Sequence, residues 1–164
     1  MGEHTDYNDG FVLPVGLPQR TRVSITRAPG AAPSSPYVAA VGSVLGVEGF
    51  VAQIESDVPI GAGLASSAAL TVATAGALSA AFGLALSPRE VALAAHRAES
   101  VEMGIGCGVM DHFAAALGRE GEALLIDCRS LDVRAIPLPP EADVRVVDSG
   151  VRHENAAEAG YRER

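Results

Sequence analysis

The amino-acid sequence predicts an α+β domain, in which strands and helices interleave without a regular β-α-β order. Hydrophobic residues make up 48% of the 164 residues, which favours a folded domain over a disordered chain. Segments in which polar and apolar residues alternate are typical of strands, and longer alanine- and leucine-rich segments are typical of helices. A chain of this length can form one domain with a substantial core.

The first third of the chain combines extended segments with one helix. Extended structure is expected at residues 11–18, 21–27 and 50–56, and we expect the first two to form a hairpin. Residues 28–36, APGAAPSSP, show no periodicity and are expected to form a loop or linker. A short helix is expected at residues 37–45, ending before Gly46.

The two clearest helices follow. Residues 66–83 begin at two serines and end at a glycine. The stretch SPRE, residues 87–90, supplies a capping box with proline at the first helical position, and this helix is expected to reach about Glu102. The later elements are a helix at about 108–117 closed by Gly118, strands near 123–127, 133–136 and 144–148, and a helix beginning near Glu154.

Composition excludes several classes of partner. A net charge of −8 argues against nucleic acid, whose phosphate backbone requires a basic surface. A single nucleotide is compatible with this charge, because backbone N–H groups, a helix N-terminus and a metal ion can hold its phosphates. No apolar run is long enough to span a membrane and no signal peptide is evident, so we expect a cytoplasmic protein.

The two cysteines, Cys107 and Cys128, are expected to be reduced thiols. They are too few for a structural zinc site unless histidine joins them, and no such spacing is evident. Nothing nearby in the sequence would lower the pKa of either thiol, so both are interpreted as structural. His96 and His153 are interpreted as ordinary helix and surface histidines.

The stretch DVPIGAGLASSAALTVA, residues 57–73, carries the strongest chemical signal. Two glycines that let the backbone approach a ligand closely precede two serines at a helix start, where free N–H groups favour an anion. It is neither a Walker A loop, which needs GK[ST], nor a dinucleotide fingerprint, which needs glycine where Ser66 stands. Taken alone, an ordinary glycine-rich turn with serine caps explains it equally well.

Several motifs in order make the chain resemble the galactokinases, which belong to the wider family of GHMP kinases. GEHTDYNDGFVLP, residues 2–14, resembles the signature that distinguishes galactokinases, and PIGAGLASSAA, residues 59–69, resembles the phosphate loop of the wider family. CGVMDHFAAALG, ALLIDCRSL and VVDSGVRHENAAEAGYRER resemble later galactokinase segments. The resemblance implies the GHMP kinase N-terminal fold (ribosomal protein S5 domain 2-like) and phosphoryl transfer from ATP to α-D-galactose, giving galactose 1-phosphate and ADP in galactose (Leloir) metabolism.

The resemblance also implies where a sugar binds. Carboxylates accept charge-assisted hydrogen bonds from pairs of hexose hydroxyls. The implied sugar ligands are Glu3, His4, Thr5, Asp6, Gly108 and Tyr161. Asp9, followed by Gly10, fits a plain turn and is assigned no chemistry.

Asp111, in CGVMDHF, is the implied catalytic residue, acting on the anomeric hydroxyl as a base or an electrostatic anchor. Gly108 just before it would let the sugar lie against the backbone. The alternative for Asp111 is an acid at a helix N-terminus, which is a common feature. The neighbouring motif favours the catalytic interpretation.

The resemblance further implies ATP and Mg²⁺ as cofactors. The implied nucleotide-binding residues are Gly61, Ala62, Gly63, Leu64, Ala65, Ser66 and Ser67. Glu99, in HRAES, and Ser67 match the family's magnesium ligands, and Mg²⁺ prefers such oxygen donors. The alternative for Glu99 is a solvated helix face, because Arg97 and Glu102 nearby are also charged.

The sequence departs from the galactokinase pattern in three places: an upstream catalytic arginine has no counterpart, residues 28–36 are shorter than usual, and no C-terminal half follows residue 164. We therefore expect an amino-terminal part of a galactokinase that binds sugar weakly and turns over little ATP. Its expected parts are the sugar-binding signature with the hairpin (1–27), the shortened linker (28–36), the ATP-binding domain (37–150) and the start of a second half (151–164). The alternatives are a non-catalytic sensor of galactose and ATP and an inactive remnant.

Overall fold

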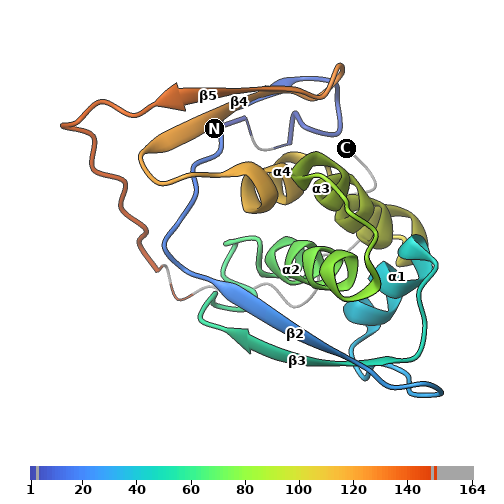
Figure 1. Ribbon diagram of the computed structural model, residues 1–164. Coiled ribbons are helices and arrows are strands. Elements are labelled where there is room, and N and C mark those ends of the chain that lie inside the picture. The colour runs from blue at the N-terminus through green and yellow to red at the C-terminus, as the bar shows by residue number, and fades with distance from the viewer. Residues whose placement is uncertain (3, 149, 151–164) are drawn as a thin grey trace.

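The computed structural model describes residues 1–2, 4–148 and 150. Its strands are β1 (Phe11–Val12), β2 (Thr21–Arg27), β3 (Phe50–Ser56), β4 (Glu122–Asp127) and β5 (Asp132–Pro137). Its helices are α1 (Pro36–Leu45), α2 (Ser66–Phe82), α3 (Pro88–Arg97) and α4 (Met110–Leu117), with the π-helical turn η1 (Ala98–Glu102) after α3. Figure 1 shows the helices as a layer between two small sheets.

The two sheets are separate. β2 and β3 pair along their whole length, from Thr21 opposite Ser56 to Arg27 opposite Phe50. β4 lies between β1 and β5, and every pairing in the described residues is antiparallel. The helices therefore do not cover one face of a single sheet. The layer order is sheet, helices, sheet (Figure 1).

The predicted hairpin between residues 11–18 and 21–27 is wrong. β1 pairs with β4, and β2 pairs with β3. Pro14 and Pro18 lie between β1 and β2 and have no backbone N–H, so this stretch cannot form a regular ladder. It contributes one isolated bridge, from Val15 to Ala123 of β4.

The central position of α2 follows from its sequence, SSAALTVATAGALSAAF, which contains no charged residue. A helix that is apolar on all sides is stable only when it is buried on all sides. α2 contacts β2 of one sheet and also α1, α3 and α4. Its fully buried Leu78 joins Phe50 and Val38 in one hydrophobic core, and the guanidinium of Arg27 lies 4.6 Å from the ring centroid of Phe82.

A second hydrophobic core joins α3 and α4 to the other sheet. Phe113 of α4, Ala92 of α3 and Ile126 of β4 are fully buried in it. The start of α4 is thereby held close to β4 and to the loop that precedes β1. This packing positions Gly108 and Asp111, which the resemblance to galactokinases assigned to sugar binding and catalysis.

The helix that begins at Pro88 changes its hydrogen bonding before it ends. Its capping box is present as predicted, with the Glu90 amide 3.3 Å from the Ser87 hydroxyl and the Ser87 amide 2.8 Å from the Glu90 carboxylate. From Ala98 the helix widens into a π turn, in which the Met103 amide donates to the Ala98 carbonyl five residues back. Such turns are frequent at functional sites.

The strand predicted at residues 144–148 is wrong. This stretch pairs with no strand among the described residues, and Val144 and Val147 are 51% and 86% exposed. Alternating side chains indicate a strand only where a neighbouring strand completes the hydrogen bonds. The helix predicted near Glu154 lies outside the described residues. Over the described ranges, none of the helices has the length and apolar character needed to cross a membrane.

Candidate active site

The first loop is a compact turn held by its own backbone. The Thr5 amide donates to the Gly2 carbonyl (3.0 Å), and the Gly10 amide donates to the Thr5 carbonyl (2.9 Å). The Thr5 hydroxyl also donates to the Gly2 carbonyl (2.6 Å). Gly2 has a φ of 92°, and a Cβ there would lie 2.6 Å from the Phe11 carbonyl oxygen, so glycine is required. Thr5 therefore braces the loop, and its contact with a sugar stays a prediction.

His4 and Asp9 of this loop have defined conformations, whereas two of the residues assigned to the sugar lie outside the described part of the chain. His4 is exposed, and its Nδ1 lies 2.7 Å from the Tyr7 hydroxyl, which orients the imidazole ring. Asp9 lies in the turn with a φ of 56°, in keeping with the structural role predicted for it. Glu3 and Tyr161, which the sequence analysis assigned to the sugar, lie outside the described residues.

The loop brings Asp6 against the segment that precedes α4. A Cβ at position 108 would overlap the Asp6 carboxylate, so the two groups are in direct contact only because residue 108 is glycine. Asp111 lies in the first turn of α4, and the Asp6 charge is close enough to act on the pKa of Asp111. The structure thus brings Asp6, from the first loop, close to Gly108 and Asp111, which lie about one helical turn apart at the start of α4.

The surroundings of Asp111 disfavour its charged form. Burial raises the pKa of this carboxyl above its ordinary value, and the charges of Asp6 and Glu99 raise it further. His112 acts in the opposite direction but does not outweigh these effects. A carboxylate with a raised pKa accepts a proton more readily than an exposed aspartate, as a general base must.

The glycine-rich loop before α2 has the backbone of an anion-binding nest. Gly61, Gly63 and Ala65 have φ values of 67°, 73° and 55°, so left-handed residues alternate with ordinary ones. Such alternation directs successive N–H groups into one concavity. Ser66 and Ser67 are the first two residues of α2, as predicted, and no side chain caps this N-terminus. Backbone donors are therefore available for a phosphate group.

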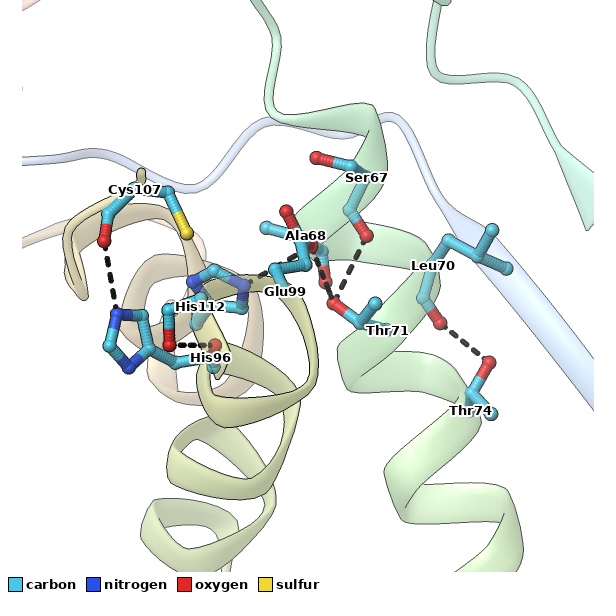
Figure 2. Close-up of polar contacts among 10 residues, drawn as sticks. Ser67, Ala68, Leu70, Thr71, Thr74, His96, Glu99, Cys107 and His112 are labelled. Atoms are coloured by element: carbon cyan, nitrogen blue, oxygen red, sulfur yellow. Dashed lines mark hydrogen bonds and ion pairs between the residues drawn. The ribbon is translucent and has the colours of Figure 1, made fainter. Parts of the chain in front are cut away.

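Glu99 is buried in η1, only 2% exposed, so the alternative of a solvated helix face is wrong. The Thr71 hydroxyl donates to Glu99 Oε1 (2.9 Å), and His112 Nε2 lies 3.2 Å from the same oxygen. Figure 2 shows Glu99 between Ser67 and Thr71 of α2 on one side and the His112 ring of α4 on the other. Two helices therefore position a single carboxylate of a third segment.

The electrostatics of Glu99 favour its charged form. Burial alone raises the pKa of a carboxyl, but the hydrogen bonds from His112, Thr71 and Ser67, together with the His112 charge, outweigh it. The pKa of Glu99 consequently lies below its ordinary value. A charged carboxylate beside the Ser67 hydroxyl, at the start of α2, offers the hard oxygen donors that Mg²⁺ prefers. The residues present therefore fit a magnesium ion, which Ser67 and Glu99 would hold.

Two neighbours of Glu99 were missed from the sequence. Thr71 and His112 are 0% and 1% exposed, and neither was singled out. Thr71 follows Ser67 by one helical turn and His112 follows Asp111 directly, and these spacings could have identified them. His96, interpreted as an ordinary helix histidine, is half-buried, with its Nε2 3.1 Å from the Cys107 carbonyl oxygen. His153 lies outside the described residues.

The two cysteines are free thiols, and no neighbour lowers their pKa values, as predicted. Burial, with the nearby charges of Glu99, Asp111 and Asp6, raises the pKa of Cys107 to about 12. Burial likewise raises the pKa of Cys128, which packs in the core between α4 and β4. Neither thiol is ionised at neutral pH.

Comparison with known proteins places these features in a family. Residues 36–119, just over half of the chain, match the model of the GHMP kinases N terminal domain. The chain belongs to the GHMP kinase family. Residues 1–30 match the galactokinase galactose-binding signature, which includes the loop that carries Asp6. The glycine-rich loop before α2 and α2 itself lie inside the first match, and Asp111 lies near its end.

The relatives of this GHMP kinase domain include galactokinases from Chloroflexus and Roseiflexus. The galactokinase of Chloroflexus aurantiacus is 39% identical over 189 residues, covering 93% of this chain and 47% of that protein. The galactokinase of Roseiflexus sp. strain RS-1 is 40% identical over 188 residues, covering 97% of this chain and 48% of that protein. Both alignments are longer than the 164 residues of this chain, so the relatives carry residues that this chain lacks.

The fold agrees with the sequence comparison. The galactokinase of Lactococcus lactis, whose crystal structure contains galactose, superposes with a TM-score of 0.73 and 24% sequence identity. The match covers 84% of this chain and 44% of that one. The chain has the α+β fold of the GHMP kinase N-terminal domain, and it spans about half the length of the curated relatives it matches.

Proposed function

We propose that this chain provides the sugar-binding and phosphate-binding part of an ATP-dependent galactose 1-kinase. The observation that carries the proposal is the contact of Asp6 with Gly108 beside Asp111, in a domain whose nest precedes α2 and whose Glu99 lies in η1. The match of residues 1–30 to a galactose-binding signature and the galactokinase relatives support the sugar assignment.

In the proposed reaction each group of this chain has a distinct task. Asp6 accepts hydrogen bonds from sugar hydroxyls and fixes the orientation of the ring. Asp111 accepts the proton of the anomeric hydroxyl as its oxygen forms a bond to the γ-phosphorus and the bond from that phosphorus to the bridging oxygen of ADP breaks. Its raised pKa suits this task. The reaction leaves galactose 1-phosphate and ADP, and the proton passes from Asp111 to solvent.

The phosphate side is held by backbone and oxygen donors. The N–H groups of the nest from Gly61 to Ala65 and of the first turn of α2 bind the phosphates. Ser67 and Glu99 would hold Mg²⁺, which neutralises phosphate charge when bound. Thr71 and His112 hold the Glu99 carboxylate in place. Phosphoryl transfer depends mainly on positioning and charge neutralisation, and this arrangement provides both.

The test measures binding and turnover by the 164-residue chain. Calorimetry should detect galactose binding that Asp6→Asn and Gly108→Ala each weaken, and glucose serves as the comparison sugar. A coupled assay of ADP release with galactose and Mg-ATP should detect turnover that Asp111→Ala abolishes while ATP binding is retained. Absence of galactose binding by a folded chain contradicts the proposal. Binding of both ligands without turnover favours the alternative, a non-catalytic sensor of galactose and ATP.

A further inference from the structure

Glu99, Cys107 and His112 come from three different segments and meet inside the molecule. Glu99 lies in η1, Cys107 in the loop that follows, and His112 in α4. One carboxylate oxygen, the thiol sulfur and one imidazole nitrogen all lie within 4.8 Å of one another. Glu99 and His112 are 2% and 1% exposed, and Cys107 is half-buried. Among the described residues this is a preformed group of three different metal-ligating side chains.

A second observation is a buried nitrogen of this group that has no hydrogen-bond partner. The Nδ1 atom of His112 is buried and has no hydrogen-bond partner in the described part of the chain. A buried polar atom without a partner costs free energy, and natural structures rarely keep one without a reason. In Figure 2 the Cys107 thiol points toward the His112 ring, whose other nitrogen faces Glu99. A single cation binds only one imidazole nitrogen, so the unpaired Nδ1 and the Nε2 atom beside Glu99 are alternative ligand atoms.

The donor set defines the class of cation. A thiolate, an imidazole and a carboxylate together are typical ligands of Zn²⁺ and of the chemically similar Co²⁺, whereas Mg²⁺ prefers oxygen alone. Ligands of a tetrahedral Zn²⁺ lie about 2.0–2.3 Å from the metal, which separates them from one another by roughly 3–4 Å. The three ligand atoms lie within 4.8 Å of one another, up to about 1 Å farther apart than this spacing. The side chains would have to draw closer together around a bound cation.

We infer that Glu99, Cys107 and His112 form a binding site for a thiophilic divalent cation such as Zn²⁺. On binding, a sulfur–metal bond replaces the S–H bond of Cys107 and the proton is released to solvent. The site leaves a fourth position for water. This site differs from the proposed magnesium site, Ser67 and Glu99, because it includes sulfur and nitrogen donors. The two sites share Glu99. If the proposed function is correct, Zn²⁺ and Mg²⁺ exclude each other at Glu99.

The test uses Co²⁺ alone as a spectroscopic probe of the folded chain, without sugar or nucleotide. The wild-type chain should show the thiolate-to-cobalt charge-transfer absorption, and added Zn²⁺ should remove it. Cys107→Ser should abolish this absorption, while the matched variant Cys128→Ser should keep it, because Cys128 lies outside the group. His112→Gln should weaken cobalt binding by at least about 10-fold, the lower end of the loss seen when metal-site groups are removed.

Circular dichroism establishes whether each variant is folded. If Cys107→Ser does not fold, the loss of cobalt binding in His112→Gln tests the inference instead. The inference is overturned if the folded wild-type chain shows no charge-transfer absorption, or if Cys128→Ser loses it as completely as Cys107→Ser. Neither result bears on the galactose proposal, because the readout contains neither galactose nor ATP.

Discussion

Two carboxylates of the site, the buried Glu99 and the half-buried Asp111, have pKa values shifted in opposite directions although both lie near His112. Glu99 accepts hydrogen bonds from Thr71 and His112, and its pKa is lowered despite burial. Asp111 is raised in pKa by burial and by the charges of Asp6 and Glu99. The pKa shifts differ in direction because Thr71 and His112 form hydrogen bonds with the Glu99 carboxylate, whereas the charges of Asp6 and Glu99 act unfavourably on Asp111. One site thereby contains a carboxylate whose charged form is favoured, Glu99, and a carboxylate that accepts a proton more readily than usual, Asp111.

The largest expected effect comes from neutralising each carboxylate in turn. Glu99→Gln should lower the free energy of unfolding by about 2–4 kcal/mol, because it breaks buried charge-assisted hydrogen bonds and leaves His112 poorly paired. Asp111→Asn should leave stability unchanged or raise it by up to about 1 kcal/mol, because it removes a charge that burial and the charges of Asp6 and Glu99 disfavour. Urea unfolding at neutral pH, followed by circular dichroism, measures both. Changes of the same sign and size would remove the contrast between the two carboxylates.

A smaller effect is expected at the contact between Asp6 and the α4 entry. Gly108→Ala should destabilise the chain by about 1–3 kcal/mol, because its Cβ overlaps the Asp6 carboxylate. Gly106→Ala, two residues earlier in the same loop, is the matched control, because its Cβ meets no atom within 4 Å. The control should change stability by less than about 0.5 kcal/mol. Thermal unfolding of both variants checks this. Combining Gly108→Ala with Asp6→Ala should restore part of the loss, and equal losses for both glycines would contradict the close contact.

The smallest expected effect is a difference in pH dependence between the two carboxylate variants. Because the folded-state pKa of Glu99 is lowered, its stabilisation exists above the ordinary value of 4.5 and is lost as pH falls through the folded pKa. Because that of Asp111 is raised, its ionisation destabilises the fold: stability is full below the ordinary value of 3.8 and is lost as pH rises through the folded pKa.

On acidification, the cost of Glu99→Gln should therefore shrink below pH 4.5, and the gain from Asp111→Asn should shrink as Asp111 becomes protonated. Urea midpoints of the wild type and both variants, measured across the acidic range, give the two curves. A cost of Glu99→Gln that does not shrink at acidic pH would show that the donors around Glu99 do not lower its pKa.

Local sequence patterns were sufficient for most elements. The capping box at Ser87 and Glu90 predicted where α3 begins, and Gly83 closes α2 as expected. These signals work because caps and turns depend on backbone groups a few residues away. The π turn at Ala98 was not predicted, because the helical pattern continues through it and only the hydrogen bonding changes. The strand expected at 144–148 was wrong, because alternation says nothing about whether a partner strand is present.

By itself, the sequence determined the helices, the uncapped serine start of α2 with its glycine-rich loop, and the motifs through which Asp6, Gly108 and Asp111 were assigned to one task. Only the tertiary structure decided that two sheets flank the helices, that Glu99 is buried between Thr71 and His112, and that Cys107 joins them. The physical reason is the distance along the chain between the residues that interact. Caps, turns and side-chain periodicity are set by neighbours along the chain, whereas the charge state of a buried carboxylate is set by donors and charges that packing brings from other helices.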